Sequence, residues 1–213
     1  MSEAYFAHAY GPDYERRNPP YKWRSFLREI LRLRQGGRLL EAGCGHGLFL
    51  RQAAAHFECV GCDTSEFAVR QARARLPREV PLFRAPLPGL ETRQRFDVIA
   101  AFDVLEHIAE LDGALDNLDR LLVPGGLLAF TVPVYDGPLG PLVDRLDKDE
   151  THVHRRGRDF WLDRLAPRFQ LKYYTGVWRY YLLGVYLNRV SRVSRRVTTA
   201  ILVLAEKPAA GRA

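Results

Sequence analysis

The sequence predicts an α/β protein built on a doubly wound, mostly parallel sheet. Two observations carry this prediction. Short apolar stretches alternate with helical stretches between residues 38 and 133, and a glycine-rich turn follows the first apolar stretch. Strands and helices that alternate in this way form βαβ units, whose strands run parallel. A chain of 213 residues is long enough for one such domain with a substantial core.

The predicted elements begin with an irregular arm over residues 1–21 and a helix from Tyr21 to Arg34. Apolar residues recur along this helix at near-helical spacing, and Gly36 and Gly37 end it. We assign residues 1–36 as an N-terminal arm and helix, and residues 37–213 as the main domain. The expected elements of that domain are strands at Arg38–Ala42, Glu58–Cys62, Val80–Arg84, Phe96–Phe102 and Gly126–Val132, and helices at 46–55, Ser65–Leu76 and 103–122.

Beyond Pro133 the pattern loosens. We expect a long loop to about Arg158, a short helix at Phe160–Leu165, and two further strands at Phe169–Thr175 and Thr198–Ala205. A loop of that length is longer than most connections and indicates a functional role.

The segment 179–197, between the last two strands, is rich in arginine and contains no acid. Read as a helix, it places five apolar residues on one face, namely Leu182, Tyr186, Val190, Val193 and Val197. Such a helix could rest on an anionic membrane surface, or cover the core with its charges in water. No nucleic-acid binding is expected, because no recognised motif accompanies the charge.

The composition is that of an ordinary soluble globular protein, with 47% hydrophobic and 27% charged residues and a formal net charge of +7. Cys44, Cys59 and Cys62 do not form an even disulfide framework. Cys59 and Cys62 have CxxC spacing, but on a strand they would point to opposite faces, which argues against a redox or zinc site. No signal-peptide pattern and no run of roughly 18 apolar residues is present. A reducing, cytoplasmic setting is therefore expected.

The first strand ends at a glycine-rich turn, residues 39–47, with the sequence Leu-Leu-Glu-Ala-Gly-Cys-Gly-His-Gly. Ligands of open α/β sheets bind at this edge. A dinucleotide fits poorly, because its fingerprint needs a glycine where Leu48 stands and Glu41 would repel a pyrophosphate. The ammonium and sulfonium of S-adenosylmethionine would be attracted by Glu41 instead. Asp63, which ends the second strand, is placed to accept the ribose hydroxyls of either cofactor.

Four stretches, taken together, resemble the motifs of class I S-adenosylmethionine-dependent methyltransferases of the small-molecule, ubiquinone-biosynthesis-like branch. They are the glycine-rich turn, Val60–Ser65, Arg95–Ile108 and Leu121–Leu128, and they come in family order. The resemblance implies a Rossmann-like, seven-stranded sheet whose last strand is antiparallel. It also implies S-adenosylmethionine as the methyl donor and S-adenosylhomocysteine as the product.

The same resemblance implies roles for individual residues. Glu41, Gly43, Cys44 and Gly45 would surround the methionine part of the cofactor. The ribose and the adenine edge would be held by Asp63 and Thr64, and Phe102 and Asp103 would lie beneath the sulfonium. After the third strand the family often carries an acidic or amide residue, which is lacking here, so contacts to the adenine are expected from the backbone around Ala85.

The expected reaction is methylation of a small molecule at oxygen, with nitrogen and carbon left open. An oxygen or amine acceptor needs a base, and we predict that His107 takes this role. Alternatively, His107 binds backbone or the cofactor carboxylate and only shapes the cavity. Two other functions stay open: an NAD(P)-dependent oxidoreductase and a non-catalytic cofactor-binding partner of another enzyme. The identity of the acceptor and the oligomeric state are not specified by these patterns.

No metal is expected in the main interpretation. Asp103, Glu106 and His107 nevertheless stand at i, i+3 and i+4, and on a helix they would share one face. With His152 or His154 from the long loop they could form a mixed carboxylate–imidazole site for a divalent ion. Such a site resembles those of some ubiquinone-pathway and small-RNA methyltransferases.

Without a metal, the long loop is interpreted as a polar surface facing the substrate, in which His152, His154 and Arg155 meet an acidic acceptor or solvent. Tyr10 and Tyr14 in the N-terminal arm are the remaining candidates for substrate contacts. In related enzymes such an arm can close over the cofactor as a lid and exclude water. A plain packing role for these tyrosines is the alternative.

Overall fold

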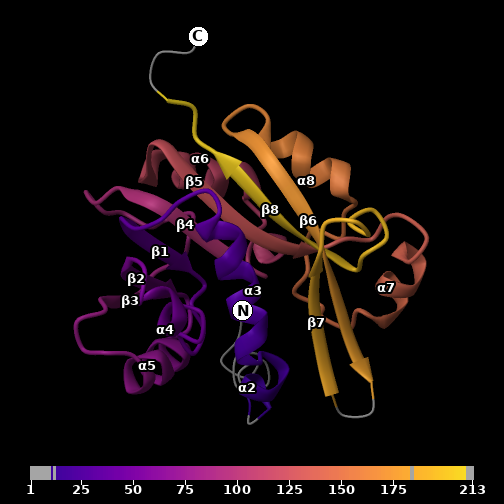
Figure 1. Cartoon of the computed structure of the whole chain (residues 1–213), viewed down its shortest axis with the longest axis horizontal. Helices are drawn as coiled ribbons and strands as arrows, with labels where there is room; N and C mark the ends of the chain where they lie inside the picture. Colours follow the sequence, from indigo (N-terminus) through magenta and orange to yellow (C-terminus); the bar gives the residue numbers. More distant parts are fainter. Residues whose placement is uncertain (1–10, 12, 183–184, 210–213) are drawn as a thin grey trace.

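The computed structural model describes residue 11, residues 13–182 and residues 185–209. Within these residues, eight strands form one sheet in the order β3-β2-β1-β4-β5-β8-β6-β7 (Figure 1). Their bounds are β1 (Arg38–Ala42), β2 (Glu58–Asp63), β3 (Leu82–Arg84), β4 (Phe96–Phe102), β5 (Leu122–Pro133), β6 (Gln170–Leu182), β7 (Val185–Ser191) and β8 (Ala200–Glu206).

The first five strands pair in parallel, with β1 between β2 and β4. The other end of the sheet is antiparallel, because β8 runs opposite to both β5 and β6, and β7 opposite to β6. The predicted doubly wound, mostly parallel sheet is therefore confirmed, and so is the antiparallel strand that the resemblance implied. The expected number of seven strands is wrong, because the described residues contain the additional strand β7.

The described residues of the segment 179–197 form no helix, and this prediction was wrong. Strands β6 and β7 form a hairpin in which Arg179 pairs with Asn188 and Val177 with Val190. Aromatic and β-branched residues are frequent in this stretch and favour strands over helices. The amphipathic helix that suggested membrane contact is therefore not formed. Among the described helices, none is both long and apolar enough to cross a bilayer.

The helices connect and cover these strands. They are α2 (Tyr14–Arg17), α3 (Pro20–Leu31), α4 (Leu50–Ala53), α5 (Glu66–Arg75), η1 (Leu105–His107), α6 (Leu111–Leu121), α7 (Gly140–Leu146) and α8 (Arg158–Leu165). Pro20 starts α3 at a position where its missing N–H is not needed. Ser65 caps α5, because its hydroxyl accepts a hydrogen bond from the Ala68 N–H at 3.2 Å.

Three helices differ from the sequence prediction. The helix expected at 46–55 shrinks to α4, because most of this stretch forms the turn that carries the glycines. The helix expected at 103–122 is interrupted. Asp103 adopts a left-handed backbone with a φ of 58°, the 3-10 turn η1 follows, and α6 begins only at Leu111. Helix α7 forms within the stretch that was expected to be a loop.

Two hydrophobic clusters lie on opposite faces of the sheet. Residues of α6 and α8 pack with Leu40 and Ile99 on one face, and residues of α3, α4 and α5 pack with Leu39 and Val98 on the other. Helix α3 therefore belongs to the core of the fold, although we assigned it to a separate N-terminal segment. That boundary at residue 36 stays a prediction.

The cysteines of the CxxC stretch lie on opposite faces of β2, as the strand geometry predicted. Cys59 belongs to the cluster with α3 and Cys62 to the cluster with α6. Both thiols are buried and free. Burial raises the pKa of each thiol to about 12, with help from the nearby carboxylates Glu41 and Asp63 respectively.

Candidate functional site

A cavity of about 570 Å³ lies at the carboxyl ends of β1, β2 and β4, where ligands of open α/β sheets bind. Most of the candidate residues line it, although they come from separate parts of the chain. They are Tyr14, Glu41, Gly43, Cys44, Asp63, Thr64, Ala85, Phe102, Asp103, Glu106, His107 and His152. Gly45, His154 and Arg155 do not line it, and Tyr10 lies outside the described residues.

The glycine-rich turn is fixed by backbone hydrogen bonds to β2. The N–H groups of Gly43 and Cys44 both donate to the carbonyl of Cys62, at 2.8 and 2.9 Å. Gly43 has a φ of +76°, and a Cβ at this position would lie 2.3 Å from Cγ2 of Val104. The turn therefore requires glycine here both for its backbone angle and for its close approach to the segment after β4.

Asp63 joins the ends of β1 and β2. Its carboxylate accepts hydrogen bonds from the N–H of Gly45 at 2.9 Å and from the N–H of Ser65 at 2.8 Å. Gly45 therefore stabilises the turn through its hydrogen bond to Asp63 and does not line the cavity. Asp63 thus fixes the glycine-rich turn and the start of α5 at the edge of the cavity, which it also lines.

Glu41 provides a test of whether the cavity fits a cationic cofactor. The side chain is buried, lines the cavity, and its Oε2 has no hydrogen-bond partner. Burial and the charge of Asp63 raise its pKa well above the ordinary value, while a backbone hydrogen bond from Leu50 and the charge of Lys22 act in the opposite direction. A cation beside Glu41 would relieve this penalty, so the residue fits an ammonium group and disfavours a pyrophosphate.

Asp103 is the centre of a cluster of charges. Oδ1 accepts hydrogen bonds from Arg179 at 2.6 Å and from the hydroxyl of Thr131 at 2.7 Å, and Oδ2 lies 3.4 Å from Nζ of Lys22. Burial alone would raise the pKa of Asp103, but the charges of Arg179 and Lys22 outweigh it and hold the pKa well below its ordinary range.

Lys22 lines the same cavity from α3 and is itself buried. Its ammonium donates to Oδ1 of Asn18 at 2.9 Å and lies over the ring of Trp23. Burial lowers its pKa to about 8, against the opposing charge of Asp103. Lys22 was not among the predicted site residues. A lysine beside Trp23 in a helix with an apolar face is nevertheless a signal for a buried, paired charge.

The hairpin β6–β7 contributes Arg179, Leu187 and Asn188 to the cavity. The sequence analysis missed these residues as well, because it placed them on a surface helix. Tyr14 of α2 also lines the cavity and lies against His46, with ring centroids 4.3 Å apart.

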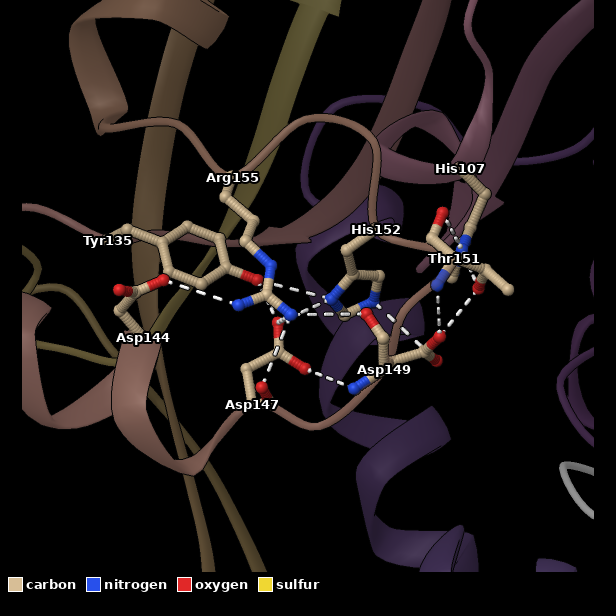
Figure 2. A network of polar contacts seen from close by, with 8 residues as sticks. All are labelled: His107, Tyr135, Asp144, Asp147, Asp149, Thr151, His152 and Arg155. Atoms are coloured by element: carbon tan, nitrogen blue, oxygen red, sulfur yellow. Dashed lines mark hydrogen bonds and ion pairs between the residues drawn. The ribbon is translucent and has the colours of Figure 1, made fainter.

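His107 lies at the end of η1, with its ring held by Thr151 (Figure 2). Nδ1 is 2.9 Å from the hydroxyl and 3.2 Å from the carbonyl oxygen of Thr151. Burial and the neighbouring ring of His152, whose centroid is 4.7 Å away, lower the pKa of His107. The imidazole is therefore held in its neutral form, which can accept a proton.

A polar network connects His152 with Asp147, Tyr135 and Arg155 (Figure 2). Nδ1 of His152 lies 2.6 Å from Oδ2 of Asp147, which also accepts a hydrogen bond from the hydroxyl of Tyr135. Burial would raise the pKa of Asp147, but the hydrogen bonds from Tyr135 and His152 hold it below its ordinary value. Arg155 closes the network by donating to the carbonyls of Asp147 and Asp149. These hydrogen bonds of Arg155 connect three positions of the loop between α7 and α8.

The structure brings together three of the candidate metal ligands, but neither Asp103 nor His154 joins them. Asp103 lies outside any helix, and His154 turns away, with Nε2 2.9 Å from the carbonyl oxygen of Ile108. Instead, among the described residues, Glu106, His107 and His152 have potential donor atoms within 4.8 Å of one another. The carboxyl oxygens of Glu106 are buried and have no partner. Burial, together with the charge of Asp103, raises the pKa of Glu106 well above its ordinary value.

A doubly wound sheet with a glycine-rich turn, an acidic residue near the end of β1 and a second acid at the end of β2 is typical of the Rossmann-like class of methyltransferases. The chain matches a family model described as a methyltransferase domain over residues 14–177. It belongs to this family of methyltransferase domains.

Two curated relatives are enzymes that methylate small molecules. The chain is 33% identical over 101 residues to a ubiquinone biosynthesis O-methyltransferase of Nitrobacter winogradskyi. This match covers 44% of the present chain and 38% of the relative. It is 30% identical over 133 residues to a trans-aconitate 2-methyltransferase of an Acidovorax species, covering 60% of this chain and 47% of the relative. The matches thus span less than half the length of each of these relatives.

Solved structures show the same fold at lower identity. The N-methyltransferase NodS of Bradyrhizobium japonicum, in complex with S-adenosylhomocysteine, has a TM-score of 0.73 and 18% identity, covering 96% of this chain and 97% of that one. A methyltransferase of Haloferax volcanii in complex with the activator Trm112 has a TM-score of 0.75 and 14% identity, covering 95% and 97%. Neither the oxidoreductase nor the non-catalytic alternative gains support from these comparisons.

Proposed function

We propose that the protein transfers a methyl group from S-adenosylmethionine to an oxygen atom of a small-molecule acceptor. The observation that carries this proposal is Glu41, a buried carboxyl group with an unpartnered oxygen in a cavity beside the glycine-rich turn. When bound, the cofactor supplies an electrophilic methyl group on a positively charged sulfur. The protein's contribution is to bind and orient the two molecules and to remove a proton from the acceptor.

At the cofactor end of the cavity, the proposal assigns Glu41 to the ammonium of the methionine part and Lys22 to its carboxylate. Both side chains line the cavity, and the charge of Lys22 acts to lower the pKa of Glu41. Gly43 and Cys44 form the adjacent wall. We assign the ribose to Asp63 and Thr64 and the adenine edge to the backbone around Ala85, as the resemblance implied.

At the acceptor end, His107 is proposed as the base. Thr151 holds Nδ1 of its ring, which leaves Nε2 to accept a proton from a hydroxyl group. The lowered pKa of His107, caused by burial and then by His152, keeps the ring neutral and ready to do so. His152 lines the same part of the cavity and is the second imidazole available there.

The proposal also includes a lid over the cofactor and a cytoplasmic location. Tyr14 and Asn18 line the cavity from the N-terminal segment, which supports closure of that segment over the cofactor. The free, buried thiols of Cys44, Cys59 and Cys62 support a reducing, cytoplasmic location. The names of the relatives, an O-methyltransferase of ubiquinone biosynthesis and a trans-aconitate methyltransferase, support a small acceptor methylated at oxygen.

The experiment is a coupled assay of S-adenosylhomocysteine release with a panel of phenols, carboxylic acids and amines. We expect turnover with one of the oxygen acceptors. His107→Gln should lower kcat by about 100-fold or more and leave S-adenosylhomocysteine affinity unchanged. His56→Gln, at an exposed histidine outside the cavity, should match the wild type. Turnover with amines alone would contradict oxygen methylation, and full activity of His107→Gln would exclude this base.

A further inference from the structure

Arg179 and Asn188 form a pair on the hairpin β6–β7, and both line the cavity. They are direct cross-strand partners in the register of the two strands, so their side chains lie on the same face of the sheet. Nε of Arg179 and Oδ1 of Asn188 are buried without a hydrogen-bond partner. Two neighbouring polar groups with unused hydrogen-bonding capacity therefore face one cavity.

Arg179 shares its counter-charge with a second cation. Asp103 is the carboxylate that Arg179 contacts, at 2.6 Å, and the same carboxylate also contacts Lys22. The contact with Asp103 leaves Nε of Arg179 buried and without a partner, and such a donor is stabilised when a ligand supplies an acceptor.

Arg179 lies toward the end of the sheet opposite to the proposed cofactor contacts. In the strand order, β4, β5 and β8 separate the hairpin β6–β7 from β1 and β2, which carry Glu41 and Asp63. With Lys22 assigned to the methionine carboxylate, Arg179 is left for the acceptor.

We propose that Arg179 and Asn188 bind a carboxylate of the acceptor, so that the enzyme acts on small organic acids. This inference rests on the function proposed above and specifies its substrate class. The planar guanidinium can donate two parallel hydrogen bonds to a carboxylate, and Nε is a free member of such a pair. Nδ2 of Asn188 can supply a further donor to the carboxylate, and the unpartnered Oδ1 is left to accept a hydrogen bond from a hydroxyl group of the same acceptor.

The test uses protein saturated with S-adenosylhomocysteine and calorimetric titration with succinate, citrate and benzoate, each compared with its neutral amide. We expect at least one acid to bind saturably while its amide does not. Arg179→Gln should weaken binding of that acid at least tenfold without changing S-adenosylhomocysteine affinity. Arg189→Gln is the matched control, because Arg189 is exposed on β7 and does not line the cavity.

Asn188→Asp is a second variant, which leaves the Arg179–Asp103 pair in place and opposes an anion by charge. It should also weaken acid binding while retaining the cofactor product. Amides that bind as well as acids, or an unchanged affinity in both variants, would overturn the proposal, as would a failure of every acid to bind the wild type. If S-adenosylhomocysteine itself did not bind, the proposed function would fail instead, so the two failures are distinguishable.

Discussion

Arg179 donates a 2.6 Å hydrogen bond to Oδ1 of Asp103, although 76 positions separate the two residues in the chain. This bond connects the hairpin β6–β7 to the end of β4. Through its other contacts, Asp103 also joins α3 and β5. One carboxylate therefore links four elements around the cavity.

Replacing this carboxylate should destabilise the protein. In Asp103→Asn, Lys22 and Arg179 lose their shared counter-charge in a partly buried position, and we expect the free energy of unfolding to fall by about 1–3 kcal/mol. Chemical denaturation measures the change. Asp119→Asn is the control, since its ion pair with Lys207 lies near the surface and should contribute less than about 1 kcal/mol. Equal effects of the two variants would contradict a central role for Asp103.

Glu41→Gln should weaken S-adenosylhomocysteine binding by about tenfold or more, because a hydrogen bond to an ionised group contributes about 1.5–3 kcal/mol. Calorimetry on the two proteins gives the ratio of affinities. Glu58→Gln removes a carboxylate from the exposed end of β2 and serves as the control. Unchanged affinity of Glu41→Gln would remove the ammonium contact from the proposal.

Binding of S-adenosylhomocysteine should become weaker as the pH rises above 8. The pKa of Lys22 is lowered by burial to about 8 in the free protein, and a bound carboxylate favours the charged ammonium. Its pKa is therefore higher in the complex, so binding takes up protons and affinity falls as Lys22 deprotonates.

Titration calorimetry in buffers of different ionisation enthalpy measures this proton uptake. The ligand's own amino group also titrates in this range. Lys22→Met is therefore the necessary control, because it binds the same ligand but lacks the side-chain ammonium of Lys22. We expect smaller proton uptake and a flatter pH dependence for Lys22→Met. Identical proton uptake by both proteins would show that Lys22 does not bind the carboxylate.

Gly43→Ala should distort the glycine-rich turn. An alanine at a φ of +76° is strained, and its Cβ would lie 2.3 Å from Val104. We expect the free energy of unfolding to fall by about 1–3 kcal/mol, with weaker binding of S-adenosylhomocysteine. Gly113→Ala is the contrasting variant: it lies within α6 with no atom near the added methyl group, and should stabilise by about 1 kcal/mol. Denaturation curves of both variants check these signs.

The sequence predicted the parallel half of the sheet and the glycine-rich turn well, because their signals are local. Glu41, Gly43 and Asp63 sit at strand ends, which apolar runs and glycines mark directly. Parallel strands then bring these ends to one edge, so their meeting in a cavity follows from the order of elements.

The acceptor end could not be predicted in this way. Arg179 and Lys22 meet Asp103 only through tertiary packing, since one comes from the hairpin and the other from α3. The apolar residues around Arg179 also fit a helical period, which led to the prediction of a helix where the structure has the strands β6 and β7. The left-handed backbone of Asp103 broke the helix on which the predicted metal set depended.

The central claim is that the cavity binds a positively charged methyl donor between Glu41 and Asp63. Calorimetric titration of the wild-type protein with S-adenosylhomocysteine and, separately, with NADH tests it most directly. The account predicts saturable one-to-one binding of S-adenosylhomocysteine and no detectable binding of NADH. Tight NADH binding without any heat from S-adenosylhomocysteine would contradict it.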